Sequence, residues 1–416
     1  MCKYSPRFKF FCIEGRIHFW FQACVYLSVC GIDDPLLRLK KCIQLHGYDG
    51  KRKYFWHAAA ILKVLIFIGR TIYAGQTLNQ PKKLAELVAT YPVRFMAIAK
   101  LYVLYIDKKR IEYFYYTINN EFWDYNIAGP KIEAEIKKRF FATNIFVLCH
   151  FIGAMSVLTF ISLFPIVDMP EGKRPLPNII WTPFDTDPSP LHEILYVIML
   201  WNLSLSVFGN AFYDVLFIYA MQHLFVQFML LKVLLMNITK EIMEEHDDYD
   251  KLSSEYFQNK VYDRLTICVA HHVKLLKFGK NLEIFSSGVL LPQLVMSYAV
   301  LVINGYILSI DHSDLMKTTI LLNLTGSCLV QLAVFAFQAS DIKFQSLSVI
   351  DSIHNSEWYL FKAPLKKALT FIIMNTKKPI SINAGGLSNV DNEVLVNIIQ
   401  KAFSAITLLR ALTAVE

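Results

Sequence analysis

Charged residues are scarce in this chain. Only 18% of its 416 residues are charged, whereas 55% are hydrophobic and 14% are aromatic. Three stretches contain no Asp, Glu, Lys or Arg: Ala142–Val167, Ile284–Ile310 and Thr318–Ser340. Each is longer than the roughly 20 residues that a helix needs to cross a bilayer, where a central charge costs about 2.5–3.5 kcal/mol. The shortage of charge excludes a soluble globular protein and predicts a membrane protein.

Motifs of catalysis and cofactor binding are also lacking. His150, His192, His271 and His272 have no Asp, Ser or Cys at a diagnostic spacing, and a catalytic site needs such groups to converge in one cleft. The sequence contains no metal, phosphate or cofactor motif. We therefore expect no enzyme activity, no cofactor and no metal.

The features of a G-protein-coupled receptor are missing as well. Such a receptor would have a glycosylated outer N-terminus, an acidic-Arg pair after its third span and a disulfide to an outer loop. Here the Asn-x-Ser/Thr matches at Asn202, Asn237 and Asn323 lie in or at the ends of apolar stretches. The proline-rich stretch Asp168–Pro190 has no cysteine, and five of the eight cysteines lie within the first 42 residues, so a disulfide framework is not expected.

Further apolar stretches bring the number of predicted transmembrane helices to seven. Phe55–Leu78 and Leu84–Ile106 carry only a few charges, and Tyr91-Pro92 predicts a kink in the second of these. Ile194–Leu231 is interrupted only by Asp214 and would be roughly 57 Å long as one helix. The seventh helix is expected at 389–413. The predicted fold class is thus an all-α membrane protein with seven transmembrane helices.

The distribution of basic residues predicts the topology. With Ile194–Leu231 as one span, 31 of the 42 Lys and Arg fall on the side of the N-terminus, whereas dividing this stretch erases the asymmetry. Because Lys and Arg gather on the cytoplasmic side, we expect a cytoplasmic N-terminus and an extracellular C-terminus. This bias explains the net charge of +8 without nucleic acid as a partner.

The same reading divides the chain into regions. Residues 1–54 form a cytoplasmic N-terminal segment, and 55–343 hold helices one to six, with a ligand pocket in their outer half. Within them, 167–190 is a Pro-rich extracellular loop and 232–283 forms cytoplasmic helical extensions. Residues 344–388 form a cytoplasmic anchor helix and turn, in which Pro364 begins a helix too short to span the membrane and Pro379 ends it. Residues 389–416 form helix seven.

Helix seven has a polar stripe along one edge. The stripe consists of Glu393, Asn397, Gln400, Lys401 and Ser404, and it continues in line to Leu408 and Leu412. The opposite face, expected to pack on the other spans, consists of Leu395, Ile398, Ile399, Ala402, Ile406 and Leu409. A membrane helix with one polar edge is typical of a pore lining. Several copies of such a helix around one axis would turn their polar edges toward a water-filled path. Lys401 is unusual for a cation pore; snorkelling or a subunit contact would accommodate it.

The chain resembles the insect odorant receptor family. The resemblance rests on the seven spans with the N-terminus inside, the Pro-rich outer loop, the overlong fourth helix, and an ending that runs from Lys378-Pro379-Ile380 through Ala384-Gly385-Gly386 to a helix from Val390. The last helix departs from the family pattern at Phe403-Ser404-Ala405, where a second aromatic residue is usual. From about Gly47 onward the resemblance covers nearly the whole chain.

The resemblance implies a function. Members of the family are odorant-binding subunits that assemble with a shared co-receptor into cation channels opened by small volatile molecules. The expected assembly is a tetramer in the plasma membrane of olfactory sensory neurons. Monovalent and divalent cations would permeate. Co-receptors have an enlarged loop between spans four and five, whereas Glu241–Glu283 is only 43 residues here, so the chain resembles the odorant-tuned partner. Leu408 and Leu412 fall where the family has its hydrophobic constriction; lipid-facing leucines are the alternative.

The resemblance also implies a ligand site under the Pro-rich loop, in spans two, three, four and six. The positions are Leu87, Val88, Tyr91, Gly153, Val157, Phe160, Met199, Asn202, Ser206, Ile320 and Leu324. This lining is mostly apolar with a few hydroxyl and amide groups, as suits an ester, alcohol or terpenoid. Ordinary helix packing or lipid contact is the alternative for each residue. A gustatory receptor channel of the same architecture remains an alternative for the whole chain.

Overall fold

The computed structural model describes residues 53–79, 84, 87–88, 90–167, 176–178, 180–240, 242, 255–310 and 315–413. The predicted N-terminal segment 1–54 therefore lies almost wholly outside the described residues, as does the first part of the Pro-rich loop. The chain forms two compact units. The first unit contains Met1–Leu84 and Arg139–Leu216, and the second contains Ala85–Lys138 and Phe217–Glu416.

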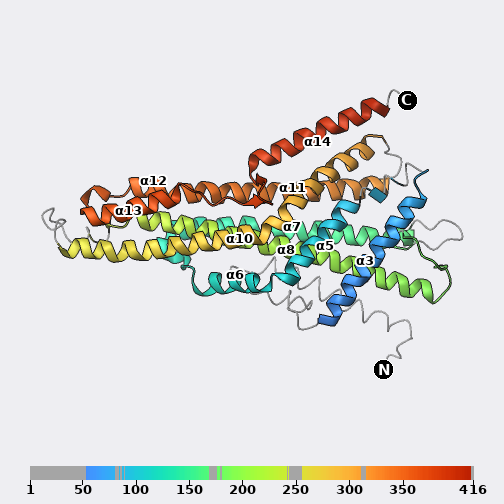
Figure 1. The fold of residues 1–416 in the computed structure, drawn as a ribbon, viewed down its shortest axis with the longest axis horizontal. Helices are drawn as coiled ribbons and strands as arrows, with labels where there is room; N and C mark the ends of the chain where they lie inside the picture. Colours follow the sequence, from blue (N-terminus) through green and yellow to red (C-terminus); the bar gives the residue numbers. More distant parts are fainter. Residues whose placement is uncertain are drawn as a thin grey trace. The chain divides into compact units, whose positions relative to one another are not determined.

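Helices make up nearly all of the described chain (Figure 1). The α-helices are α3 (Lys53–Gln76), α5 (Tyr91–Ile106), α6 (Lys108–Asn120), α7 (Pro130–Val167), α8 (Leu191–Met236), α10 (Glu255–Ile310), α11 (Leu315–Leu347), α12 (Val349–His354), α13 (Ala363–Thr376) and α14 (Asn392–Thr413). Two 3₁₀ turns, η2 (Tyr125–Ala128) and η4 (Trp358–Leu360), and two short strands, β1 (Asn383–Ala384) and β2 (Ser388–Asn389), lie between them. The prediction of an all-α fold is confirmed.

Six helices of the described chain are long and apolar enough to cross a membrane. They lie in α3, α7, α8, α10, α14 and the stretch from α11 to α12, and they coincide with six of the seven predicted spans. The remaining span, predicted at 84–106, contains α5, which has only 16 residues. Leu84, Leu87 and Val88 are helical, Thr90 lies in a turn, and α5 begins at Tyr91 with Pro92 in its first turn, so the helix of this span is interrupted beside the proline, where a kink was predicted. The count of seven spans and the orientation of the termini stay predictions.

The predicted fourth span is one uninterrupted helix, as expected. Helix α8 has 46 residues, which corresponds to roughly 69 Å. Every residue from Ala211 to Leu231 is buried, and the one acidic residue among them has a partner, since Oδ2 of Asp214 lies 3.4 Å from Nε2 of His150 in α7. A long apolar sequence without proline explains why the helix continues.

Helix α10 is the central element of the second unit. It has 56 residues and packs against α5, α6, α11 and α14. An aromatic cluster fills part of this core: the ring centroid of Phe114 in α6 lies 5.1 Å from that of Phe278 and 5.5 Å from that of Phe285, both in α10. Such ring pairs add to the free energy gained by burying their apolar surface.

The predicted anchor region folds largely as expected. Leu365, Leu369 and Ile372 of α13 are buried, and Ile373 is half-buried. In Figure 1, α12 and α13 lie beside the first half of α10. Gln258 of α10 donates to the Leu360 carbonyl at 3.1 Å and accepts from the Lys362 amide at 2.9 Å. These contacts join the anchor region to the extension of the fifth span, although its cytoplasmic location stays a prediction.

Gln227 of α8 fixes the turn after α6 to two long helices. Its Oε1 accepts from the Trp123 amide at 3.1 Å and its Nε2 donates to the Trp123 carbonyl at 2.9 Å. The same Oε1 lies 2.9 Å from Nε2 of His271, whose ring stacks on the Trp123 indole with centroids 3.6 Å apart. One buried amide thus satisfies backbone polar groups of a half-buried turn.

The substitution Gln227→Leu should destabilise the protein. It leaves the Trp123 amide and carbonyl without this partner, and each buried unsatisfied polar group costs about 1–3 kcal/mol. Gln222→Leu on the same helix is the matched control, because the amide nitrogen of Gln222 is buried and has no hydrogen bond. Denaturant unfolding of the purified protein should show a clearly larger loss in the free energy of unfolding for Gln227→Leu than for Gln222→Leu. Equal losses in the two variants would contradict this role of Gln227.

Candidate functional site

A tight hairpin positions the start of α14. Strands β1 and β2 pair with Asn383 opposite Asn389 and Ala384 opposite Ser388. Gly385 and Gly386 turn the chain with φ angles of +59° and +75°, a region that residues with a Cβ rarely adopt. A turn was predicted within 344–388, but strands were not, because two residues in a strand are too few to show an alternating pattern.

The hairpin is bound to α10 and α11. The Gly385 amide donates to the Ser287 carbonyl of α10 at 3.1 Å. The Asn383 side chain donates to Oε1 of Glu283, also of α10, at 2.9 Å. Just before the hairpin, the Ile380 amide donates to Oγ of Ser346 in α11 at 3.1 Å. Bonds to two helices fix the hairpin and, through it, the first residue of α14.

The first turn of α14 is capped by side chains. Oδ1 of Asp391 accepts a hydrogen bond from the Val394 amide at 3.2 Å, which is the usual stabilising interaction at a helix N-terminus. The Asn392 amide donates to Oγ of Ser340 in α11 at 3.0 Å. The other carboxylate oxygen of Asp391 lies 3.8 Å from Nζ of Lys343. These contacts set the direction in which the helix leaves the hairpin.

The polar stripe of α14 is exposed over its whole length. Glu393, Asn397, Gln400, Lys401 and Ser404 are all exposed. Leu408 and Leu412, in line with them, each expose 61% of their surface. Figure 1 shows α14 leaving the hairpin at an angle to α11. All seven residues predicted to line a pore are therefore available for contact with water or with another subunit.

The predicted packing face of α14 is narrower than expected. Leu395 and Ala402 are buried, and Ile398 and Ile406 are half-buried. Ile399 and Leu409 are exposed, a correction to the prediction that the whole face packs on other spans. In the described part of the chain, α14 packs against α10 and α11, and these two helices cover Leu395 and Ala402 but leave Ile399 and Leu409 exposed.

Helices α14 and α10 pack tightly at a glycine. A Cβ placed on Gly305 of α10 would lie 2.5 Å from Cδ1 of Ile406, closer than two carbon atoms can come. The absence of a side chain at 305 allows the two helices to pack at this level. The sequence alone gave no reason to select this glycine from the sixteen in the chain.

Replacing Gly385 tests the docking of the hairpin. Gly385→Ala combines a disfavoured positive φ with a Cβ only 2.7 Å from Cδ2 of Leu291, whereas Gly386→Ala has the positive φ with nothing within 4 Å. Each substitution should cost about 1–2 kcal/mol of backbone strain, and Gly385→Ala should cost more because of the clash. Thermal unfolding of both variants measures the difference, and a Gly386→Ala variant as unstable as Gly385→Ala would refute the steric argument.

The predicted ligand residues divide between the two units. In the second unit, Leu87 is buried, Val88 is exposed, and Tyr91, Ile320 and Leu324 are half-buried. In the first unit, Gly153, Phe160 and Ser206 are half-buried, and Met199 and Asn202 are buried. The side chain of Val157 lies outside the described residues. A common pocket formed by all of these residues stays a prediction.

Two predicted ligand residues share a charged partner that the sequence analysis did not include. Nζ of Lys63 in α3 lies 3.2 Å from Oδ1 of Asn202 and 3.3 Å from its carbonyl oxygen, and it also donates to Oγ of Ser206. A lysine in a membrane-spanning helix is costly, and these three oxygens of α8 solvate it. The sequence contained a sign of this contact. Lys63 lies in one apolar stretch and Asn202 in another, and each of these polar side chains needs a polar partner.

Polar side chains also face each other between α10 and α11. Nε2 of Gln293 donates to Oε1 of Gln331 at 3.0 Å and to Oγ of Ser297 at 3.1 Å. Farther along the pair, Nδ2 of Asn304 donates to Oγ1 of Thr325 at 3.2 Å. Hydrogen bonds of this kind contribute to helix association inside a membrane. Sequence reasoning missed them because each residue is isolated in an apolar run.

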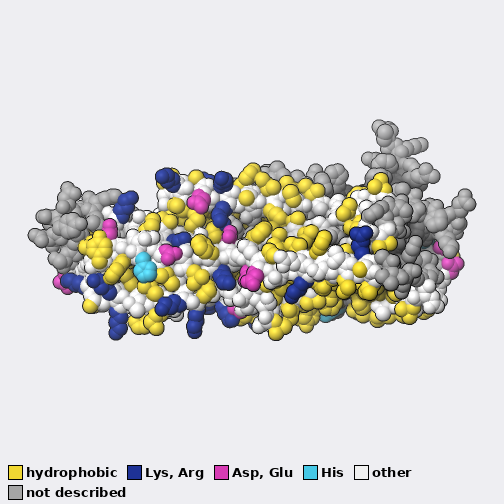
Figure 2. All heavy atoms as spheres, turned by 90° about the horizontal axis from the view of Figure 1, so that it is seen from above, with side chains coloured by type: hydrophobic (Ala, Val, Ile, Leu, Met, Phe, Trp, Pro, Cys, Tyr) yellow, Lys and Arg dark blue, Asp and Glu magenta, His cyan; other side chains and the backbone are white. Residues whose placement is uncertain are grey.

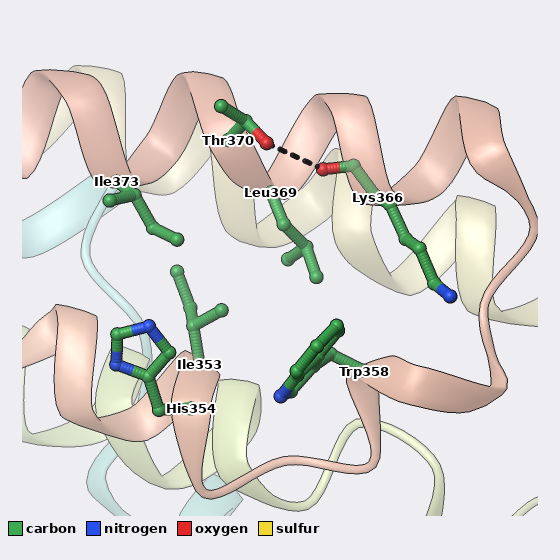
Figure 3. A pocket seen from close by; sticks show the side chains of 7 residues that line it. All are labelled: Ile353, His354, Trp358, Lys366, Leu369, Thr370 and Ile373. Atoms are coloured by element: carbon green, nitrogen blue, oxygen red, sulfur yellow. Dashed lines mark hydrogen bonds between the residues drawn. The ribbon is translucent and has the colours of Figure 1, made fainter.

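A small hollow lies in the anchor region (Figure 3). It measures about 170 Å³, and Nζ of Lys366 lies 5.7 Å from the centre of the Trp358 ring on its wall. Its lining consists of Ile353, His354, Trp358, Lys366, Leu369, Thr370 and Ile373. The sequence analysis did not anticipate it. No three His, Cys, Asp or Glu side chains in the described part of the chain come together as a possible metal site.

The long apolar helices define a multi-pass helical membrane protein. Hydrophobic side chains cover much of the face in Figure 2, as lipid contact requires, and Lys and Arg gather toward the end where α12 and α13 lie. The sequence pattern of the 7tm Odorant receptor family matches residues 84–403. The chain therefore belongs to the odorant receptor family, and the resemblance seen in its sequence is confirmed.

Curated relatives are insect odorant receptors. Odorant receptor 82a of Drosophila melanogaster is 27% identical over 150 residues, which is 36% of this chain and 38% of that protein. Odorant receptor 30a of the same species is 23% identical over 222 residues, 53% of this chain and 55% of that protein. Odorant receptor Or2 of Anopheles gambiae is 23% identical over 158 residues, 38% and 42% of the two chains. The chain thus matches about two fifths to just over half of the length of these relatives.

A solved structure has the same fold. The insect olfactory receptor OR5 from Machilis hrabei, determined in complex with eugenol, matches with a TM-score of 0.73 over 95% of this chain and 99% of that chain, at 12% identity. A second structure of OR5 from Machilis hrabei matches with a TM-score of 0.72 over 95% of this chain and 98% of that chain, at 11% identity. At such low identity the likeness shows the fold alone.

Proposed function

We propose that this chain is the odorant-binding subunit of a ligand-gated, non-selective cation channel. A small volatile, mainly apolar molecule opens it, and a co-receptor subunit completes a tetramer in the plasma membrane of olfactory sensory neurons. The exposed polar stripe of α14 carries the proposal, because Glu393, Asn397 and Ser404 are exposed on a helix apolar enough to cross a membrane. Polar side chains there are costly in lipid but stable beside a water-filled path.

The pore requires several subunits. One helix cannot enclose water, whereas four copies of such a helix around an axis give a continuous polar surface. The exposed apolar residues Val396, Ile399 and Phe403 then have a place at the contacts between neighbouring subunits. Glu393 attracts cations at one end of the path, and rings formed by Leu408 and Leu412 close it by excluding water.

The family supports an odorant as the ligand. The relatives are named odorant receptors, and OR5 of Machilis hrabei was solved with eugenol, a small volatile aromatic molecule. This favours an odorant receptor over the gustatory alternative of the same architecture. The Lys and Arg side chains that gather around α12 and α13 in Figure 2 support a cytoplasmic anchor region, because basic residues gather on the cytoplasmic side of membrane proteins.

Cysteine accessibility tests the pore assignment. In cells that also express a co-receptor, cysteines placed at Glu393, Asn397, Ser404 and Leu408 should react with a water-soluble, charged thiol reagent and change the odorant-evoked current. Leu395→Cys and Ala402→Cys are the controls, because both side chains are buried against other helices. Patch recording before and after the reagent gives the rates of modification. Equal rates on the two faces with ligand present would disprove the pore lining.

Polar substitutions at the constriction should hold the channel open. Leu408→Ser and Leu412→Ser hydrate the proposed apolar rings, so the current without ligand should rise severalfold. Leu409→Ser is the control, because Leu409 is an exposed leucine of the same helix but lies outside the stripe. The ratio of the current without ligand to the maximal evoked current is the measurement. A Leu408→Ser channel that stays closed without ligand would argue for lipid-facing leucines.

A further inference from the structure

The hollow between α12, η4 and α13 has a mainly apolar lining. Its apolar side chains converge from these three elements in Figure 3, and they are Ile353, Trp358, Leu369 and Ile373. The volume is about 170 Å³, and an apolar cavity of roughly 150 Å³ is large enough to hold a benzene molecule. Trp358 is 41% exposed, so one wall of the hollow is accessible from outside the chain. The hollow therefore has room for one ring or one short branched chain.

A positive charge lies beside this apolar surface. Nζ of Lys366 is 5.7 Å from the centre of the Trp358 ring, within the range in which an ammonium group interacts with an aromatic face. Lys366 and His354 both line the hollow, and in the described part of the chain neither side chain makes a hydrogen bond or an ion pair. The ammonium group thus has N–H donors for a molecule whose apolar part occupies the hollow.

The surroundings of the hollow are basic. Residues 344–388 contain five lysines and only two acidic residues, Asp351 and Glu357. The carboxylate of Glu357 accepts a hydrogen bond from the Thr239 hydroxyl, and neither acidic residue is part of the lining. An anionic group at the rim of the hollow is therefore attracted, whereas a cationic group is repelled.

We propose that this hollow binds a small amphipathic anion. The apolar part of the ligand is about the size of a benzene ring and packs against Ile353, Leu369 and Trp358, while its carboxylate accepts a hydrogen bond from Nζ of Lys366. Burial of the ring supplies most of the affinity, and the carboxylate at the exposed rim adds a smaller contribution. None of the lining residues is among the predicted odorant-binding residues. The hollow is thus a second ligand site, whether or not the chain conducts ions.

Three fluorinated probes separate the contribution of the ring from that of the charge. They are para-fluorobenzoate, which carries both, para-fluorobenzyl alcohol, which carries the ring alone, and fluoroacetate, which carries the charge alone. Each is titrated with the full chain in nanodiscs of zwitterionic lipid, and fluorine NMR relaxation gives the dissociation constant after subtraction of nanodiscs without protein. Fluorobenzoate should bind at least about tenfold more tightly than fluoroacetate, because its ring is buried. It should bind about threefold more tightly than the alcohol, because an exposed ion pair contributes little.

Two variants locate the site. Lys366→Met should lower the affinity for fluorobenzoate about threefold, to that of the alcohol, and leave the affinity for the alcohol unchanged. Lys367→Met is the matched control, because Lys367 is the next residue of α13 and is exposed but does not line the hollow. Thr370→Phe should weaken the binding of both ring probes at least about tenfold, because the larger side chain at this lining position takes the place of the ring. Met374→Phe is its control, since Met374 is exposed on the same helix outside the lining.

The pattern across the variants decides the inference. Weaker binding of fluorobenzoate in Lys366→Met and Thr370→Phe, but in neither control, supports it. If Thr370→Phe fails to fold, Lys366→Met still decides, because an unchanged affinity for the alcohol shows that the hollow is intact. A wild-type chain that binds neither ring probe, or binds fluorobenzoate and the alcohol equally, overturns the inference. Unchanged binding of both ring probes in Thr370→Phe also overturns it, because the probes then bind elsewhere.

Discussion

The attachment of the hairpin to α10 is the interaction on which the candidate pore depends. The Gly385 amide reaches the Ser287 carbonyl, and the Asn383 side chain reaches Glu283, so α14 can begin at only one level of the second unit. The Asp391 cap and the Ser340 hydroxyl then set its direction. These bonds satisfy backbone groups at the N-terminal end of α14. The rest of the helix therefore needs few contacts with other helices, and its polar stripe stays exposed.

A second constraint acts throughout the chain: a polar group placed among apolar helices needs a partner. Asp214 has His150, Gln227 has Trp123 and His271, and Gln293 has Gln331. Each pair joins elements that are distant in sequence and fixes their register. Asn202 satisfies only its oxygen, through Lys63.

Much of the fold could be predicted from the sequence because crossing a membrane demands long apolar helices. The charge-free stretches predicted α7, α10 and α11, and the basic-residue bias correctly predicted that α8 is one helix. The buried face of α13 followed from its periodicity and its flanking prolines. Tyr91-Pro92 marked the place where the helix of the second predicted span is interrupted, because a proline cannot supply the backbone hydrogen bond that continues a helix through it.

The sequence by itself determined the class of protein, the helices and the polar stripe of α14, since hydropathy and helical periodicity are properties of neighbouring residues. Only the tertiary structure decided which edge of α14 packs, that Ile399 and Leu409 stay exposed, and that Gly305 faces Ile406. It also decided that Lys63 meets Asn202 and Ser206, which lie about 140 residues away. Such partners are set by how helices are placed against each other, and a single sequence carries no local pattern for that placement.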